Sequence, residues 1–311
     1  MSAALPSGAD GVTLCLEELV PYRRLAGQVQ LTPKTASRAH QAGQHLARAR
    51  GRGMDFDEVR QYQVGDDIRT IDWRVTARTG KPHTKMFREE RERPVQLIVD
   101  LGPTMQFGSK LLLKAVQAGH LASLLAWHVA ERGDRIGALI GNGLGHREIK
   151  PKGRQQGALA LLHGLIEVQG QAPDLHHQAP GLMNELLRRS LKLASPGSQI
   201  WLVTDLQGWD SESQWLLSRL HKHADVTVFM VTDPLELTVP QSRLPLTLPV
   251  QGPGQKGLLP IGSNRFRTAY QRSRLTQIQA IRQTLKSLDI RFCAVGAQQS
   301  LEFQLDRVQP C

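Results

Sequence analysis

The stretch VQLIVD at residues 95–100 decides the fold class of this chain. It is an almost unbroken run of β-forming residues, which is typical of a strand buried on both faces of a sheet. A helical pattern occupies about residues 110–132 and ends before Gly133, where a glycine commonly terminates a helix. A second apolar stretch, RIGALIG, follows at residues 135–141. This alternation of strand and helix patterns predicts a parallel sheet covered by helices.

The rest of the sheet is predicted from four further stretches. HREIK at residues 146–150 follows RIGALIG too closely for a helical crossover, so it is predicted to pair antiparallel at the sheet edge. The last three strands are predicted at 199–205, 226–233 and 290–296, with helical patterns at about 155–168, 181–194 and 265–288. The fold class is therefore predicted as α/β, with a doubly wound, mostly parallel six-stranded sheet and one antiparallel edge strand.

A change in composition at Pro94 marks the predicted domain boundary. Amphipathic helical segments and a polar, Arg- and Asp-rich stretch lie before it, and the alternation of strands and helices begins after it. We therefore predict an N-terminal helical and irregular subdomain at residues 1–94 and an α/β domain at residues 95–311. A Pro- and Gly-rich excursion at residues 240–262 interrupts the second domain.

Positive charge is concentrated in two parts of the sequence. The 311-residue chain has a formal net charge of +11. Residues 19–54 contain seven Lys or Arg and no acid, and residues 237–288 contain eight and no acid, so the rest of the chain is net negative. This pattern favours an acidic partner, nucleic acid or an anionic surface. The alternative is that the basic patches only maintain solubility.

The sequence predicts a soluble cytoplasmic protein. The most apolar long segment, residues 111–129, contains Lys114, Gln117, His120 and His128, which is typical of a buried helix and not of a membrane span. The N-terminal residues lack the basic and apolar regions of a signal peptide. The three cysteines form no C-x-x-C pair, so we expect reduced thiols and neither a zinc ribbon nor a redox motif.

Polar residues at the ends of two predicted strands form the first candidate site. Asp100 and Asp205 end the first and fourth strands, which are neighbours in the commonest order of a doubly wound sheet. Thr104 adds a hydroxyl group from the loop after the first strand. These oxygen atoms can coordinate a hard cation such as Mg²⁺. The alternative is that both aspartates accept hydrogen bonds from backbone amides at tight turns.

At these residues the chain resembles the von Willebrand factor A domain, a family that binds a divalent ion through an Asp-x-Ser-x-Ser loop, a distant Thr and a later Asp. Asp100 matches the first Asp, Thr104 the second Ser and Asp205 the later Asp. Gly102 stands in place of the first Ser, and residues 105–203 contain no threonine. The resemblance implies a degenerate metal-ion-dependent adhesion site, with at most weak Mg²⁺ binding.

A second resemblance lies upstream, at residues 51–108. The string GRGMDFDEVRQYQVGDDIRTIDWRVTART, followed by KPHTKMFREERERPVQLIVD and MQFG, resembles the signature of the family called domain of unknown function 58. These are von Willebrand factor A-like proteins, usually encoded beside a MoxR-type AAA+ ATPase. The resemblance implies a non-catalytic, protein-binding partner or adaptor of an ATPase that remodels other proteins, with an unknown protein client.

The same signature is rich in arginine and aspartate, which can form bidentate ion pairs. We predict that these residues form a buried structural clamp around an apolar tryptophan. The alternative is a docking surface for the partner. The residues concerned are Arg60, Asp66, Asp67, Arg69, Asp72, Trp73 and Arg78.

No enzymatic activity is predicted. The chain has no phosphate-binding G-x-x-x-x-G-K-[ST] loop and no G-x-S-x-G elbow. GNGLG at residues 141–145 has the wrong spacing for a dinucleotide-binding motif and is interpreted as a hairpin turn. The main alternative function is non-specific nucleic-acid binding through the basic stretches. An aromatic content of 5% provides few rings for base stacking, so such binding would rest on phosphate contacts.

Overall fold

The structure, a computed structural model, describes residues 5–31, 54–63, 65–89, 94–171, 179–240, 247–252 and 255–308. It divides into two compact units. Met1–Ala39 and Arg93–Cys311 together form the first, which we call the sheet unit, and His40–Glu92 forms the second, which we call the small unit.

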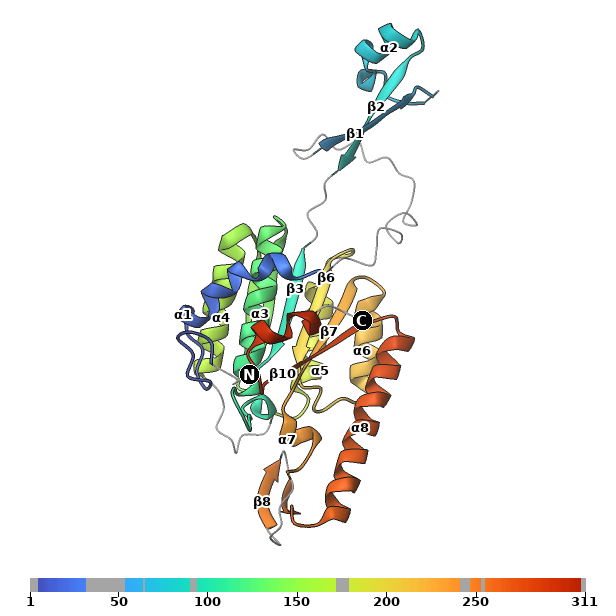
Figure 1. The fold of residues 1–311 in the computed structure, drawn as a ribbon. Coiled ribbons are helices and arrows are strands. Elements are labelled where there is room, and N and C mark those ends of the chain that lie inside the picture. Colours follow the sequence, from blue (N-terminus) through green and yellow to red (C-terminus); the bar gives the residue numbers. More distant parts are fainter. Residues whose placement is uncertain are drawn as a thin grey trace. The chain divides into compact units, whose positions relative to one another are not determined.

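A six-stranded sheet forms the centre of the sheet unit (Figure 1). Its strand order is β10-β7-β6-β3-β4-β5, and all neighbouring strands are parallel except β4 and β5, which are antiparallel. The predicted doubly wound α/β fold with one antiparallel edge strand is confirmed. The strands are β3 (Val95–Asp100), β4 (Arg135–Gly141), β5 (His146–Gly153), β6 (Gln199–Thr204), β7 (Asp225–Thr232) and β10 (Arg291–Gly296).

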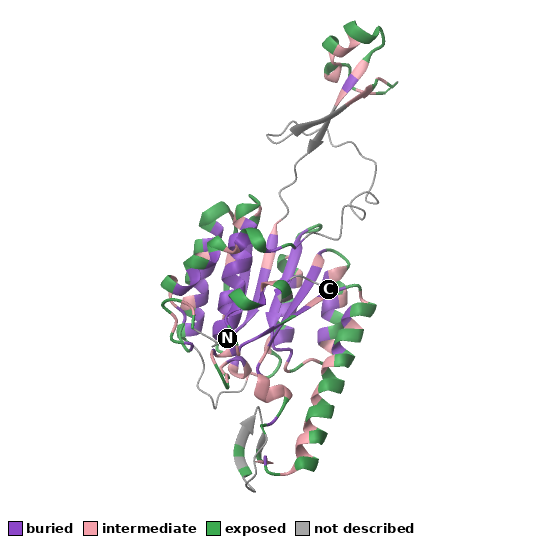
Figure 2. Cartoon of the chain, viewed as in Figure 1, coloured by how far each residue is buried: buried purple, intermediate pink, exposed green. Residues whose placement is uncertain are grey.

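Helices cover both faces of this sheet (Figure 1). Because side chains alternate along β3, Leu97 and Val99 join the core under α3 and α4, whereas Ile98 joins the core under α5, α6 and α8. Figure 2 shows the buried residues gathered in the strands and in the helix faces against them. No helix in the described part of the chain is long and apolar enough to span a membrane. The helices are α3 (Lys114–Glu131), α4 (Arg154–Gly170), α5 (Leu182–Leu193), α6 (Ser211–His221) and α8 (Asn264–Ser287).

The first described residues belong to the sheet unit. Helix α1 (Leu16–Leu19) and the short turns after it pack against α3, where the Ser123 hydroxyl donates a hydrogen bond to the Leu19 carbonyl over 2.7 Å. Leu19 and Tyr22 are buried in the core on that face. The structure therefore divides the chain differently from the predicted 1–94 subdomain, because these apolar side chains are covered by α3.

The chain between β7 and β10 contains regular elements. The short helix α7 (Pro234–Leu237) follows β7, and β8 (Thr247–Gly252) pairs with β9 (Gln255–Pro260) in an antiparallel hairpin within the predicted Pro- and Gly-rich excursion. The long helix α8 comes next, with only Ile281 and Leu285 buried among its residues.

The small unit is an antiparallel pair of strands with a helix between them. β1 (Met54–Gln61) pairs with β2 (His83–Glu89), and their connection contains η3 (Ile68–Thr70) and α2 (Trp73–Thr79). Gly80 ends α2 with a φ of 70°, a left-handed conformation that glycine adopts without steric cost.

Candidate functional site at the carboxyl ends of the strands

The fold brings the two predicted strand-end aspartates together. β3 and β6 are adjacent and parallel. Asp100, the last residue of β3, and Asp205, the residue after β6, therefore lie at the same edge of the sheet, at the ends of neighbouring strands. Both residues are only 4% exposed. Asp100 accepts hydrogen bonds from the Gly102 amide and the Thr204 hydroxyl, each over 2.9 Å, and Asp205 accepts one from the Gln207 amide over 2.9 Å. The predicted alternative of Asp–amide bonds at tight turns is therefore confirmed.

A buried lysine completes the site. Lys114 is the first residue of α3, and its side chain is fully buried. Its ammonium group donates to Asp205 Oδ2 over 2.7 Å and to Glu236 Oε1 over 2.5 Å. Glu236 reaches the site from α7, with 19% of its side chain exposed. The positive charge beside these carboxylates is thus supplied by the chain itself.

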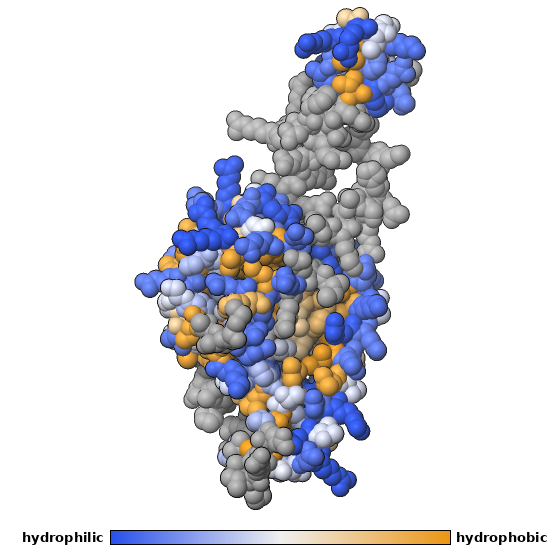
Figure 3. All heavy atoms as spheres, in the orientation of Figure 1, coloured by the Kyte–Doolittle hydropathy of each residue, from blue (hydrophilic) through white to orange (hydrophobic). Residues whose placement is uncertain are grey.

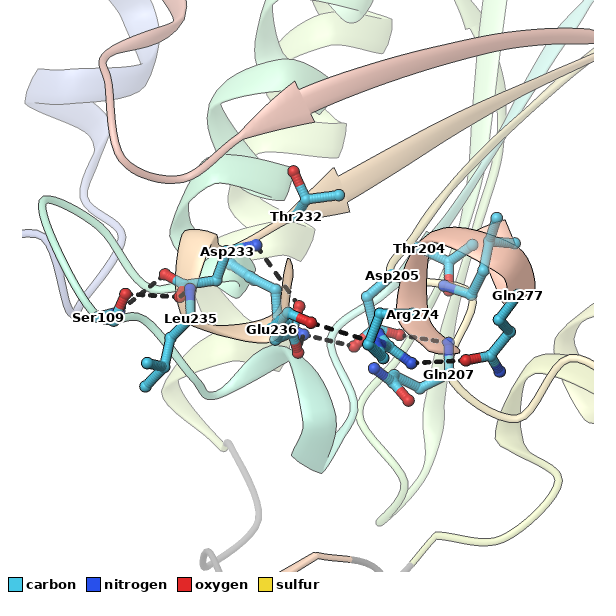
Figure 4. A network of polar contacts seen from close by, with 12 residues as sticks. Ser109, Thr204, Asp205, Gln207, Thr232, Asp233, Leu235, Glu236, Arg274 and Gln277 are labelled. Atoms are coloured by element: carbon cyan, nitrogen blue, oxygen red, sulfur yellow. Dashed lines mark hydrogen bonds and ion pairs between the residues drawn. The ribbon is translucent and has the colours of Figure 1, made fainter. Parts of the chain in front are cut away.

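A second carboxylate fixes the loop that follows β3. Asp233 is fully buried at the end of β7 and accepts from the Ser109 amide and hydroxyl over 2.8 and 2.6 Å (Figure 4). It also accepts from the Leu235 amide over 2.8 Å, which caps α7. Arg274 of α8 donates to the Glu236 carbonyl over 3.2 Å. These bonds hold α7, which carries Glu236, in place beside Lys114.

Burial and charge determine the protonation of the site. Burial, together with the neighbouring Asp205 carboxylate, raises the pKa of Asp100 to about 6. Burial lowers the pKa of Lys114, but the carboxylates of Asp205 and Glu236 outweigh it and raise the pKa above its usual value. Lys114 is therefore a stable ammonium ion at neutral pH, whereas Asp100 gains a proton in mildly acidic solution.

The residues present do not fit a divalent ion in the manner of a von Willebrand factor A domain. In the described part of the chain no hydrogen bond joins Thr104 to Asp100 or Asp205, and no group of three or more His, Cys, Asp or Glu is placed to hold a metal. The Lys114 ammonium already occupies the cation position at Asp205. The threonine at this site is Thr204, and its hydroxyl donates to Asp100.

Lys114 and Glu236 were not predicted as site residues. One sequence signal could have found the lysine: it lies in a largely apolar, buried helix, and a buried ammonium requires carboxylate partners. Its partners are 91 and 122 residues away along the chain, so no local spacing identifies them.

The small unit differs from the predicted buried clamp. Asp72 caps α2 by accepting from the Arg74 and Val75 amides over 3.0 and 3.1 Å, and it pairs with Lys85 at 3.5 Å. The Val75 amide bond is the main cause that lowers the Asp72 pKa. Trp73 is 69% exposed, so it is not an apolar anchor within this unit.

The other predicted clamp residues divide between local bonds and the surface. Arg60 pairs with Asp66 at 2.6 Å, and Asp67 accepts from the Arg69 amide over 3.0 Å to cap η3. The side chains of Arg69 and Arg78 are exposed and form no ion pair among the described residues. Short local bonds to aspartate thus replace most of the predicted Arg–Asp network.

Comparison with known proteins identifies the family. The model of the family described as "Protein of unknown function DUF58" matches residues 58–280. Uncharacterised proteins of Mycobacterium bovis and Mycobacterium tuberculosis are 28% identical over 200 residues, which is 64% of this chain and 61% of theirs. This chain therefore aligns with less than two thirds of the length of these relatives.

Two solved structures are similar to the chain at low sequence identity. The conserved hypothetical protein BatB from Bacteroides thetaiotaomicron is 12% identical with a TM-score of 0.37, covering 63% of this chain and 98% of that one. A von Willebrand factor type A protein from Catenulispora acidiphila is 12% identical with a TM-score of 0.33, covering 48% and 35%. With the family model matched over most of the sheet unit and part of the small unit, the chain belongs to the DUF58 family of proteins of unknown function.

Proposed function

We propose that this protein is a non-catalytic, protein-binding adaptor that works with a MoxR-type AAA+ ATPase on a protein client in the cytoplasm. The observation that supports the adaptor function is the internal neutralisation of the strand-end site by Lys114. A buried ammonium with two carboxylate partners stabilises the fold but leaves no open coordination position for a substrate. The ATPase partner rests on the family resemblance of residues 51–108.

Co-purification tests this proposal. The tagged full chain, expressed in its native host, is expected to recover a MoxR-type ATPase that mass spectrometry identifies. The two purified proteins are then expected to form a complex in solution, measured with and without ATP. Purified proteins that fail to associate under every nucleotide condition would contradict the proposal.

One observation favours nucleic-acid binding as a second candidate function. Four exposed cations on α8 form no ion pair with any described residue, and helical geometry places them within about 100° around the helix axis. They are Arg265, Arg272, Arg282 and Lys286. The other basic stretch, at residues 19–54, lies mostly outside the described residues.

Salt dependence tests the second candidate. For non-specific duplex binding through α8, the logarithm of the binding constant is expected to fall linearly with the logarithm of the salt concentration. Each phosphate contact that is lost makes this slope shallower by about 0.9. Arg272→Gln with Arg282→Gln is the variant to measure against the unchanged protein. Unaltered slope and affinity in this variant would exclude α8 as the phosphate-binding face.

A further inference from the structure

We infer that the exposed face of α2 and η3 in the small unit docks on an acidic protein surface that offers an apolar pocket, and this inference rests on the adaptor function proposed above. We use the name tryptophan face for six exposed residues of these two elements: Ile68 and Arg69 of η3, and Trp73, Arg74, Ala77 and Arg78 of α2.

Helix α2 has two chemically different sides. Val75 and Thr76 are half-buried, and the Thr76 hydroxyl accepts a hydrogen bond from the His83 amide of β2 over 3.0 Å. Trp73 and Ala77 are one helical turn apart on the opposite side, and both are exposed. Helix α2 is therefore attached to β2 through Thr76, whereas Trp73 is exposed.

The apolar groups on this face do not stabilise the unit that carries them. Trp73 is 69% exposed and Ile68 is 64% exposed. The helix is held by the Asp72 cap and by the Thr76–His83 bond instead. Contiguous exposed apolar patches mark interaction surfaces. Tryptophan and arginine are enriched among the residues that dominate binding energy.

The charge on this face selects the partner. Arg69, Arg74 and Arg78 are exposed and form no ion pair with the described residues. The aspartates of the same segment are engaged elsewhere, in the Arg60–Asp66 pair and the caps of η3 and α2. The outward charge is consequently positive, which complements an acidic surface.

The presence of an aliphatic side chain favours protein over nucleic acid as the occupant. A tryptophan with arginines can stack on bases, but Ile68 has no ring for stacking and gains most from an apolar pocket. In a protein interface, Trp73 fills such a pocket, and Arg74 with Arg78, one helical turn apart, contacts acidic groups beside it.

The experiment compares two pairs of full-length variants for binding to the purified MoxR-type ATPase. Trp73→Ala and the double change Arg74→Glu with Arg78→Glu alter the tryptophan face. Trp215→Ala, at a tryptophan 56% exposed on α6, is the control for the first. Lys150→Glu with Lys152→Glu, at exposed lysines of β5 without ion pairs among the described residues, is the charge-matched control.

We expect Trp73→Ala and the α2 charge reversal each to weaken ATPase binding by about 30-fold or more, with both controls within about threefold of the unchanged protein. Circular dichroism is expected to show unchanged melting for Trp73→Ala, because the side chain is already exposed. If the unchanged protein fails to bind the ATPase, the proposed function itself is wrong. If it binds and the tryptophan-face variants bind equally well, the docking surface is wrong.

Discussion

Lys114 lies at the first position of α3 with its ammonium group buried between Asp205 and Glu236. Removing one partner of a buried ion pair leaves uncompensated charge in the interior, which costs about 3–5 kcal/mol. Lys114→Ala is therefore expected to lower the free energy of unfolding of the sheet unit by that amount at neutral pH. Lys110→Ala, at an exposed lysine four residues earlier, is the control.

The same variant tests why the site does not fit a metal. With the ammonium present, calorimetry with Mg²⁺ or Mn²⁺ is expected to give weak heat or none. In Lys114→Ala, the vacated position lies between two carboxylates, so Mn²⁺ is expected to raise the melting temperature. Micromolar metal binding by the unchanged protein, abolished by Asp100→Ala, would show that the lysine does not replace the metal.

Asp100 gives the site a predictable pH dependence. Its folded-state pKa of about 6 lies above the usual value of 3.8, so the folded state holds the proton more tightly than the unfolded chain. The resulting stabilisation is fully present below about pH 4 and is lost as the pH rises through 6. Two pKa units correspond to about 3 kcal/mol.

Urea unfolding of Asp100→Asn beside the unchanged protein measures this effect. The difference in unfolding free energy between the two proteins is expected to shift by about 2 kcal/mol between pH 4 and pH 7, with the unchanged protein losing the stability. If the unfolding free energies of the two proteins change with pH in parallel over this range, the pH dependence does not come from Asp100.

At the scale of elements, Asp233 connects β7, α7 and the loop after β3. It is fully buried and accepts from the backbone amides of Ser109 and Leu235. Asp233→Ala leaves these donors without an acceptor, at about 1–3 kcal/mol for each donor that stays buried. Ser109→Ala removes a single hydrogen bond of the hydroxyl group and is expected to cost about 1 kcal/mol. The melting temperature of Asp233→Ala should therefore be clearly lower than that of Ser109→Ala. Equal melting of the two variants would show that this link between elements is unimportant.

At the scale of the whole molecule, the chain consists of two units with separate internal contacts. Asp72 caps α2 in the small unit, so Asp72→Ala is expected to increase hydrogen exchange in the peptide covering α2. Peptides covering β3 and β6 in the sheet unit are expected to keep their protection. Asp72→Asn retains a capping oxygen and is the matched control, expected to exchange as the unchanged protein does. Faster exchange in β3 would contradict a purely local effect of the Asp72 cap. Figure 3 shows residues of hydrophobic and of hydrophilic character side by side on the small unit.

The strands and their topology could be predicted from the sequence because their signals are local. A short run such as VQLIVD is apolar at every position, and four residues between β4 and β5 cannot form a crossover. The proximity of Asp100 and Asp205 followed from the order of strands in a doubly wound sheet, and their bonds to backbone amides followed from the turns in which they lie.

The cation at the site and the surface of the small unit were decided only by the tertiary structure. Lys114 and Glu236 are 122 residues apart in the sequence and belong to different helices. No periodic pattern in the sequence indicates that two such residues form an ion pair. In the small unit, Arg and Asp at close spacing are compatible with either a buried network or helix caps. The position at which α2 begins makes Asp72 a cap and leaves Trp73 exposed, because the helix turns its inner side, with Thr76, toward β2.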